Sequence, residues 1–237
     1  MKNIALLIAG GSGNRMGQSI PKQFLTVNER PVIIYTLEVF QKHPEIDEIA
    51  VVCIDGWQSV LQAYANQFNI TKLKHIVKGG KNGQDSIRNG IYELKNYYDD
   101  EDIILIHDAI RPMTSAEIIS DCIRVTKEKG SAISVIPCAE AMMQTEDGNV
   151  STGSYPRDKL KRTQTPQGFH LGKIYNLHKR ALEAGITNSV ASCTLMIEMG
   201  EQVYFSMGSE KNIKLTTVED IDIFKALLMA KRSDWLK

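Results

Sequence analysis

The sequence contains few cysteines and no excess of charge, and both absences exclude kinds of protein. Its four cysteines are far apart and form no C-x-x-C pair, which is typical of buried reduced thiols rather than of zinc ligands or disulfides. They are Cys53, Cys122, Cys138 and Cys193. Because 28 basic residues balance 28 acidic ones, no net charge would draw the chain to nucleic acid or to an anionic membrane. Any site for a phosphorylated ligand must therefore be local.

Long apolar segments are also missing from the N-terminal part of the chain. Residues 4–9 are continuously apolar, but this run is too short to cross a bilayer. Residues 1–3 before it carry neither the long apolar stretch nor the small-residue cleavage site of a signal peptide. We therefore expect a cytoplasmic protein whose partners include neither a membrane nor nucleic acid.

The most informative stretch that is present runs from Ile4 to Phe24. It begins with the apolar run at residues 4–9, which is typical of a strand buried on both faces of a parallel sheet. Glycines follow, so that peptide N–H groups can turn inward around an anion, and Arg15 and Lys22 would supply the countercharge. These glycines are Gly10, Gly11 and Gly13. The pattern predicts a phosphate-binding loop.

Two familiar glycine motifs fit this stretch poorly. A dinucleotide-binding fingerprint requires G-x-G-x-x-G, whereas the third glycine here, Gly17, comes one place late and Arg15 lies inside the turn. A P-loop requires Gly-Lys followed by Ser or Thr, and no such triplet follows Gly13 or Gly17. On the glycines alone, a plain turn between a strand and a helix remains open, although Lys22 and its neighbours favour a binding loop.

Apolar runs alternate with helical patterns through the first half of the chain. The expected strands cover residues 49–54, 73–77 and 103–106, and the expected helices cover residues 31–40, 57–68 and 84–97. This alternation predicts an α/β fold with a largely parallel, twisted sheet flanked by helices, in a single domain that covers residues 1–237. Ligands bind at the carboxyl ends of such strands, where three turns should converge: residues 10–17, 79–86 and 107–112.

The alternation stops after a strand that ends at residue 137. Asp147-Gly148, a dipeptide typical of hairpin turns, lies between short segments of mixed polarity within residues 143–155. We therefore expect a protruding β-hairpin arm at about residues 138–157. The elements expected beyond it are a helix over residues 171–184, a strand over residues 202–206 and a last helix over residues 218–231.

Three polar residues near these strands have two interpretations each. Asp108 directly follows a buried strand, where its carboxylate would either hold Mg²⁺ against nucleotide phosphates or cap a helix. His107 next to it is more often a hydrogen-bonded structural residue than a general base, because phosphoryl-type transfer depends on positioning and charge stabilisation. Lys214 would either stabilise negative charge or be a solvated surface residue, as lysines usually are.

Six blocks of sequence occur in the order that is typical of one family. They are residues 9–17 (AGGSGNRMG), 21–24 (PKQF), 79–80 (GG) with 85–86 (DS), 107–112 (HDAIRP), 163–167 (TQTPQ) and 212–216 (NIKLT). Through them nearly the whole chain resembles the cytidylyltransferases that act on 2-C-methyl-D-erythritol 4-phosphate and on D-ribitol 5-phosphate. The resemblance implies the Rossmann-like nucleotide-diphospho-sugar transferase fold. It also implies an enzyme, a nucleotidyltransferase that moves CMP from CTP to a polyol phosphate and releases pyrophosphate.

The resemblance also implies which residues bind CTP. Arg15 and Lys22 would hold the triphosphate, and Lys214 would stabilise the α-phosphate while it is attacked. Asp108 would carry Mg²⁺ or another divalent cation. The other residues implied to bind the nucleotide are Ala9, Gly10, Gly11, Ser12, Gly13, Gly79, Gly80, Ser86 and Ala109.

In the half that binds the acceptor, the chain both matches and departs from the family. Arg157 and Thr165 fall where the family binds the acceptor phosphate, and the family's arms reach a second subunit, which implies a homodimer. The methylerythritol enzymes typically have Asp-Thr where this chain has Glu140-Ala141, and Thr-Asp-Glu-Ala near residues 189–192, which are Ser-Val-Ala-Ser here. An arginine that usually follows the second glycine pair is Gly83.

Because of these departures, we expect D-ribitol 5-phosphate as the acceptor, for the synthesis of a cell-surface polymer. The alternative acceptor is 2-C-methyl-D-erythritol 4-phosphate, for isoprenoid precursor synthesis. A non-catalytic nucleotide-binding module is a remote alternative, and the retention of Arg15, Lys22, Asp108 and Lys214 speaks against it. Uridylyl or guanylyl transfer to a sugar 1-phosphate shares the fold, but its loop spacing and acceptor motifs are missing.

Overall fold

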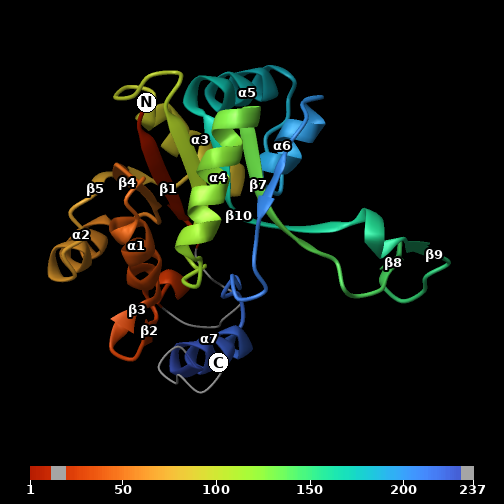
Figure 1. Ribbon diagram of the computed structural model, residues 1–237, viewed down its shortest axis with the longest axis horizontal. Coiled ribbons are helices and arrows are strands. Elements are labelled where there is room, and N and C mark those ends of the chain that lie inside the picture. Colours follow the sequence, from red (N-terminus) through yellow and green to blue (C-terminus); the bar gives the residue numbers. More distant parts are fainter. Residues whose placement is uncertain (12–19, 231–237) are drawn as a thin grey trace.

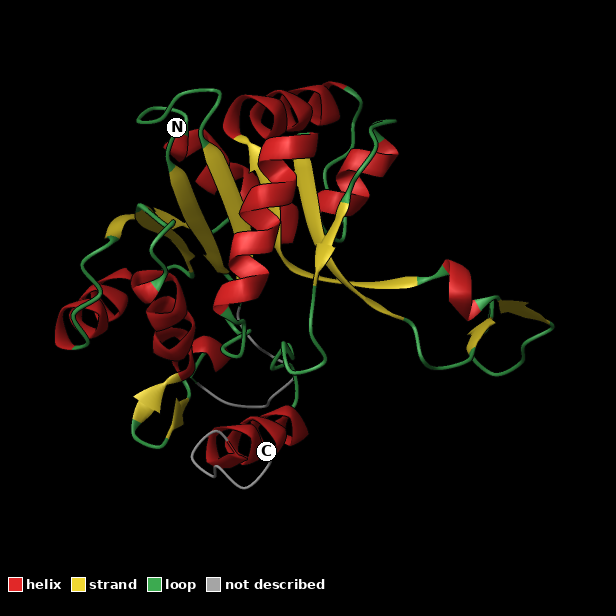
Figure 2. Ribbon diagram, in the orientation of Figure 1, coloured by secondary structure: helices red, strands yellow, loops and turns green. Residues whose placement is uncertain are grey.

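The central element of the protein is a seven-stranded, mostly parallel sheet (Figures 1 and 2). The structure is a computed structural model that describes residues 1–11 and 20–230. Along the sheet the strands lie in the order β11-β7-β10-β6-β1-β4-β5. Their bounds are β1 Asn3–Ala9, β4 Glu48–Cys53, β5 Leu73–Lys78, β6 Ile103–Asp108, β7 Ser131–Pro137, β10 Lys161–His170 and β11 Phe205–Met207.

Strands β1, β4, β5 and β6 pair in parallel, as the alternation of strands and helices predicts. β10 runs antiparallel to both of its neighbours, β6 and β7. It was not among the predicted strands, because Pro166 in its middle removes a donor from the ladder and indicates a loop. The register of β10 against β7 shifts between Thr163 and Gln167, so the proline lies at an irregularity that the sheet tolerates.

Helices cover both faces of the sheet, and successive residues of β1 point to opposite faces. Ala5 and Leu7 pack with the helices α1, α2 and α4, whereas Ile4 and Leu6 pack with α3, α5 and α6. The bounds of these helices are α1 Val32–Lys42, α2 Gln58–Gln67, α3 Gly83–Leu94, α4 Ala116–Lys129, α5 Leu171–Glu183 and α6 Ser192–Glu198. The fold predicted from the sequence is therefore confirmed.

Two helices, α4 and α6, were not among the predicted elements. For α4 the local signals are present, since the side chain of Ser115 caps its first turn and Gly130 ends it in the left-handed region at φ 82°. α6 is only one to two turns long and begins without a side-chain cap. Its position depends on burial of Leu195 and Met196 against the sheet, which is a tertiary effect.

The last described helix, α7 (Val218–Ala230), lies beyond the carboxyl edge of the sheet (Figure 1). It packs through Phe224 on a small cluster that contains Val27, Ile110 and Leu215. Val27 belongs to a short antiparallel pair, β2 (Thr26–Val27) and β3 (Arg30–Pro31), which follows the 3₁₀ turn η2 (Lys22–Phe24). This cluster closes the side of the molecule toward which β1 and β6 run.

A β-hairpin arm projects from the body (Figure 1), as the sequence predicts. Its strands β8 (Met142–Gln144) and β9 (Gly153–Tyr155) pair only with each other, and the 3₁₀ turn η3 (Arg157–Lys159) follows them. The connection between the strands is longer than a two-residue turn. Within it the Asp147 carboxylate accepts hydrogen bonds from the N–H groups of Asn149 and Val150, and Gly148 adopts φ 78°.

The cysteines and the lengths of the apolar helices complete the description of the fold. All four cysteines are buried and unpaired, so the prediction of reduced thiols is confirmed. No helix in the described residues is long and apolar enough to span a membrane.

Candidate active site

A cavity of about 740 Å³ opens at the carboxyl ends of β1 and β6. The three turns that the sequence predicts to converge all contribute to its lining, through Gly10 and Gly11, through Gly80–Gly83 with Ser86, and through His107–Asp108 with Arg111. Lys22 and Lys214 also line it, from segments far apart in the sequence. Lys81 of the second glycine turn is a third lysine of the lining. A mostly parallel sheet thus presents one acidic side chain, three lysines and two glycine turns to one cavity.

The two glycine turns approach each other so closely that they exclude side chains. A Cβ added to Gly10 would lie 2.9 Å from Ser86 Oγ, and one added to Gly79 would lie 3.3 Å from Gly10 Cα. Ser86 Oγ accepts a hydrogen bond from the Gly80 N–H at 3.0 Å and donates to the Asn82 carbonyl at 2.9 Å. The Ser86 hydroxyl therefore holds the second turn in shape, and its proton is already used within the protein.

Gln23 holds the beginning of the first glycine turn. Its amide Nε2 donates to the carbonyls of Ala9 at 2.8 Å and Gly11 at 3.1 Å, and its side chain is buried. The sequence places Gln23 in the block with Lys22 but gives no sign of this role, because the contact depends on how the chain folds back. Three other predicted residues, Ser12, Gly13 and Arg15, lie outside the described residues.

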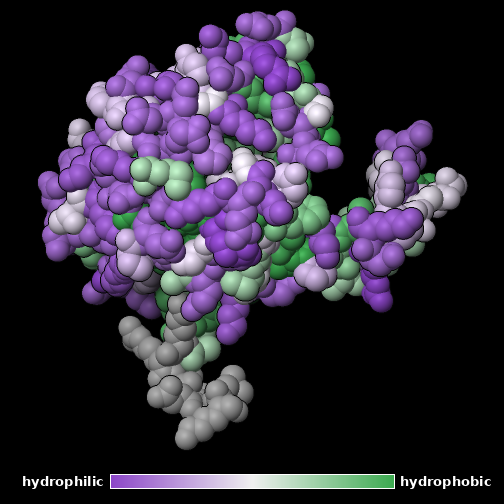
Figure 3. Space-filling view, turned by 45° about the horizontal axis from the view of Figure 1, so that its top comes forward, coloured by the Kyte–Doolittle hydropathy of each residue, from purple (hydrophilic) through white to green (hydrophobic). Residues whose placement is uncertain are grey.

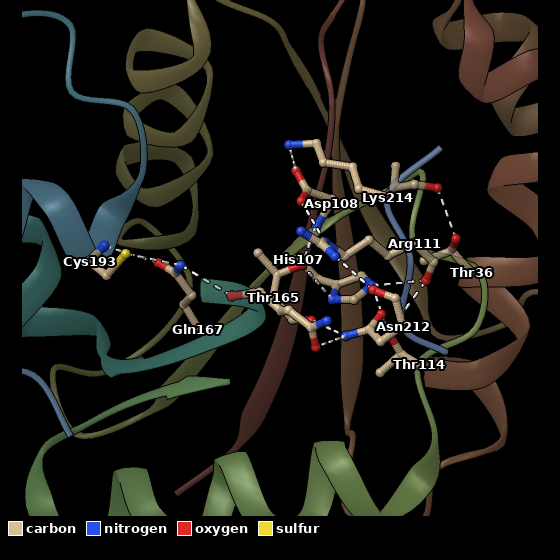
Figure 4. Close-up of polar contacts among 12 residues, drawn as sticks. Thr36, His107, Asp108, Arg111, Thr114, Thr165, Gln167, Cys193, Asn212 and Lys214 are labelled. Atoms are coloured by element: carbon tan, nitrogen blue, oxygen red, sulfur yellow. Dashed lines mark hydrogen bonds and ion pairs between the residues drawn. The ribbon is translucent and has the colours of Figure 1, made fainter. Parts of the chain in front are cut away.

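Asp108 lies at the end of β6 between two cations (Figure 4). Its Oδ1 is 3.0 Å from Lys214 Nζ, and its Oδ2 is 2.9 Å from Arg111 Nε. Burial raises the pKa of the carboxyl group, but the charges and hydrogen bonds of Lys214 and Arg111 outweigh burial, so the pKa lies below its ordinary value. Asp108 is therefore ionised at neutral pH.

His107 is fully buried in the wall of the cavity, and its ring has protein partners on both sides (Figure 4). Thr165 Oγ1 accepts from the Asp108 N–H at 3.0 Å, so its proton can go to His107 Nδ1, also at 3.0 Å. Nε2 then carries the hydrogen and faces the Arg111 carbonyl at 3.3 Å. Burial lowers the pKa of His107 to about 4. A neutral, hydrogen-bonded ring favours the structural interpretation over a general base.

Asn212 is the polar residue of this region that sequence reasoning missed. It is completely buried, its Oδ1 accepts from Thr114 Oγ1 at 2.8 Å, and its Nδ2 donates to the Thr165 carbonyl at 2.8 Å. Its own carbonyl accepts from Arg111 Nη1 at 2.7 Å. The resembling family block 212–216 contains Asn212, but a buried amide cannot be recognised from the sequence alone.

Three of the other predicted residues occupy different positions relative to the cavity. Thr165 lines it, although its hydroxyl proton is used by His107 as described above. Ala109 is buried below the cavity, since its N–H donates to the Ile8 carbonyl and its carbonyl accepts from Thr36. Arg157 lies on the arm, outside the described lining of the cavity, and donates to the Ala139 carbonyl at 2.9 Å.

Another part of the cavity wall is made by β10 and the segment that leads into α6. Gln167 accepts from the Cys193 N–H at 3.0 Å, and Gln84 on α3 binds the segment through Ile186 and Ser189. Val190 lies in the lining with 94% of its surface exposed. An apolar residue therefore occupies this part of the rim of the cavity.

Asp108 is the only carboxylate in the described lining of the cavity, and the described residues contain no cluster of three metal-ligating side chains. Mg²⁺ is commonly held by one or two carboxylates together with substrate phosphates and water, and each carboxylate oxygen has two acceptor sites. The residues present therefore fit a cation shared with a bound nucleotide, but not one enclosed by protein ligands.

Glycine turns, a carboxylate and lysines at the carboxyl edge of a mostly parallel sheet define a nucleotide-binding α/β protein. The family model described as 2-C-methyl-D-erythritol 4-phosphate cytidylyltransferase (IspD) matches residues 3–230. The chain belongs to this IspD family, and it is a cytidylyltransferase, a nucleotidyltransferase enzyme that uses CTP.

Relatives from three organisms describe the range of this family. A protein from Lacticaseibacillus paracasei, named ribitol-5-phosphate cytidylyltransferase, is 40% identical over 229 residues that cover 96% of this chain and 98% of the relative. A protein from Clostridium botulinum, named 2-C-methyl-D-erythritol 4-phosphate cytidylyltransferase, is 37% identical and covers 96% of this chain and 97% of its own. The solved structure of 4-diphosphocytidyl-2C-methyl-D-erythritol synthase from Anaerococcus prevotii matches with a TM-score of 0.81, 25% identity and 96% coverage of both chains.

Proposed function

We propose that the protein transfers CMP from CTP to D-ribitol 5-phosphate and produces CDP-ribitol and pyrophosphate. The observation that carries the proposal is the pairing of Lys214 Nζ with Asp108 Oδ1 at 3.0 Å inside a cavity bounded by two glycine turns. The choice of acceptor is supported by the 40% identity to a relative named for ribitol 5-phosphate.

In the proposed reaction an oxygen of the acceptor phosphate attacks the α-phosphorus of CTP. A new P–O bond forms, the bond from the α-phosphorus to the oxygen that bridges to the β-phosphorus breaks, and pyrophosphate leaves with that oxygen. Negative charge accumulates around the α-phosphate, and cations fixed in advance favour that state over the ground state. Lys214 and Lys22, which line the cavity, would supply this charge, and Arg15 stays a prediction for the same role.

The nucleotide would bind against the two glycine turns. Gly10, Gly11 and Gly80 leave backbone open to the cavity, and Ser86 maintains the turn on which the cytidine would lie. Asp108 would hold Mg²⁺ or another divalent cation, which when bound neutralises charge on the nucleotide phosphates. The acidic group remains ionised at neutral pH, as this role requires, because Lys214 and Arg111 lower its pKa.

The acceptor would bind beside Thr165, and we infer that Arg157 reaches it from a second copy of the chain. Arg157 lies in η3, directly after the strands of the arm, and it is not among the described residues that line the cavity of its own chain. The arm also exposes apolar side chains, with Met143 65% and Tyr155 52% exposed. Figure 3 shows further apolar surface where the arm leaves the body. A homodimer would bury this surface and bring the arginine to the partner's cavity.

We propose that residues 1–237 form one domain from which the arm extends. Because the proposed reaction uses CTP, we also propose a cytoplasmic location.

The second candidate acceptor is 2-C-methyl-D-erythritol 4-phosphate. The description of the family model and the Clostridium botulinum relative favour it. Exposed Val190 at the rim and Ala141 at the base of the arm speak against it, because both are apolar at positions where the chain departs from the residues typical of methylerythritol enzymes.

Pyrophosphate release tests the proposal. We expect release with CTP, Mg²⁺ and D-ribitol 5-phosphate together, and little release when UTP or GTP replaces CTP. Release with 2-C-methyl-D-erythritol 4-phosphate but not with ribitol 5-phosphate would instead support the second acceptor. Absence of release with every phosphorylated polyol, while CTP still bound, would indicate a nucleotide-binding module.

A further inference from the structure

Lys214 lies on a segment that no helix or strand holds in place. The chain between β11 and α7, residues 208–217, contains no regular element, yet Lys214 Nζ lies within 3.0 Å of Asp108 Oδ1. Downstream, buried Leu215 anchors the segment, since its N–H donates to the Ile110 carbonyl at 3.0 Å. Upstream, Gln164 exchanges hydrogen bonds with the main chain of Ser209, and Arg162 pairs with Glu210. The buried contacts nearest to Lys214 are those of Asn212.

Every polar group of Asn212 has a partner in the described protein. Its side chain accepts from Thr114 and donates both to the Thr165 carbonyl and to Gln164 Oε1, the latter at 3.2 Å. Its main-chain N–H donates to the Ser209 carbonyl at 3.0 Å. These partners come from the segment after β6, from β10 and from its own segment. One buried amide thus joins three separate parts of the chain beside Arg111 (Figure 4).

Arg111 connects this junction to the acidic group. Its Nη1 binds the Asn212 carbonyl at 2.7 Å while its Nε binds Asp108 Oδ2 at 2.9 Å. Asp108 Oδ1 in turn pairs with Lys214, two residues after Asn212. Asn212, Arg111, Asp108 and Lys214 therefore form a closed ring in which each member limits the position of the next.

We propose that Asn212 is a positioning residue for nucleotidyl transfer, which sets the place of the Lys214 ammonium relative to Asp108. The inference rests on the proposed function, because it assumes that Lys214 acts on the α-phosphate. An asparagine is suited to the role, since it combines one acceptor with two donors on a short side chain. Aspartate would lose both donors and would face the Thr165 carbonyl and Gln164 Oε1 with a negative charge.

A double-mutant cycle tests whether Asn212 acts through Lys214. Lys214→Ala alone should lower kcat about a hundredfold or more, as expected when one charge-stabilising donor is removed. Asn212→Ala alone should lower kcat at least tenfold and change the KM for CTP little, because the glycine turns stay intact. In the double variant kcat should equal that of Lys214→Ala, because the misplaced group is already absent.

A matched control separates positioning from loss of stability. Ser206→Ala removes another buried polar contact nearby, the 3.4 Å pair with Ser134, but this residue is outside the ring. It should lower the melting temperature without lowering kcat. Should Asn212→Ala not fold, Thr114→Val provides the same cycle, since it removes the donor to Asn212 Oδ1 with little change in volume.

The outcomes distinguish this inference from the proposed function. Two results would overturn the positioning role and leave the function standing. In the first, the fold-losses of kcat in the two single variants multiply in the double variant. In the second, Asn212→Ala keeps a nearly normal kcat while Lys214→Ala is slow. Nearly normal turnover of Lys214→Ala, or no transfer by the unmodified protein, would instead overturn the function on which the inference rests.

Discussion

At the scale of single residues, Asp108 combines a structural contact with a proposed catalytic one. Asp108→Asn keeps the shape of the side chain but removes the charge opposite Lys214 and Arg111. Activity should fall at least a hundredfold, because the divalent cation loses its carboxylate ligand. Stability should also fall, by about 1–3 kcal/mol, because the mostly buried Arg111 loses its charged partner. Steady-state kinetics and urea unfolding measure the two effects.

Asp121 provides the matched control for this substitution. It pairs with Arg124 three residues later, as Asp108 pairs with Arg111, and its side chain is 24% exposed against 21% for Asp108. Asp121→Asn should lower stability and leave turnover intact. Normal turnover in Asp108→Asn, with loss of stability alone, would show that the carboxylate is only structural.

Two buried histidines predict how stability depends on pH. Burial lowers the pKa of both His107 and His178 from 6.5 to about 4. Between these two values the unfolded chain binds more protons than the folded one, so stability is complete above pH 6.5 and declines as the pH falls toward 4. Each histidine should remove about 2 kcal/mol between pH 7 and pH 5.

His178→Phe isolates one of these contributions. Neither ring nitrogen of His178 has a hydrogen-bond partner among the described residues, so an aromatic replacement breaks no bond there. The unfolding free energy of the variant should change less between pH 7 and pH 5 than that of the unmodified protein. Equal pH dependence in urea titrations of both proteins would show that His178 does not remain neutral in the fold.

At the scale of elements, the arm allows a test by complementation. If each arm brings Arg157 to the partner's cavity, Arg157→Ala and Lys214→Ala inactivate different halves of the same site. Mixed dimers of the two variants would regain one complete site, and statistical exchange would restore about a quarter of normal activity. The baseline is the activity measured immediately after the two variants are mixed, before their subunits have exchanged. No recovery after full exchange would mean that each arm serves its own chain.

The elements also show where sequence reasoning succeeds and where it stops. The strands β1, β4 and β6 were predictable because continuous apolar runs mark strands that are buried on both faces. β10 was not, because its proline and polar residues are tolerated only where the register shifts. The predicted bounds of the hairpin arm lie close to those of β8 and β9, because Asp147 and Gly148 encode a local turn that needs no tertiary support.

The same distinction applies to the cavity. Asp108 and Lys22 could be selected from the sequence, because charged residues beside a buried strand or a glycine loop are unusual. Gln23 and Asn212 could not, because their amides act through carbonyl groups that only the folded chain brings near. Sequence patterns therefore identify residues that face a ligand better than residues that hold them in place.

At the scale of the whole molecule, we propose that nucleotide and acceptor bind in one cavity, and the choice of acceptor is the central claim. The most direct measurement is a competition in which D-ribitol 5-phosphate and 2-C-methyl-D-erythritol 4-phosphate are present at equal concentration with limiting CTP and Mg²⁺. Mass spectrometry of the products then reports the ratio of the two kcat/KM values. We predict that CDP-ribitol forms in large excess. Predominance of the cytidylylated methylerythritol, or equal amounts of the two products, would contradict it.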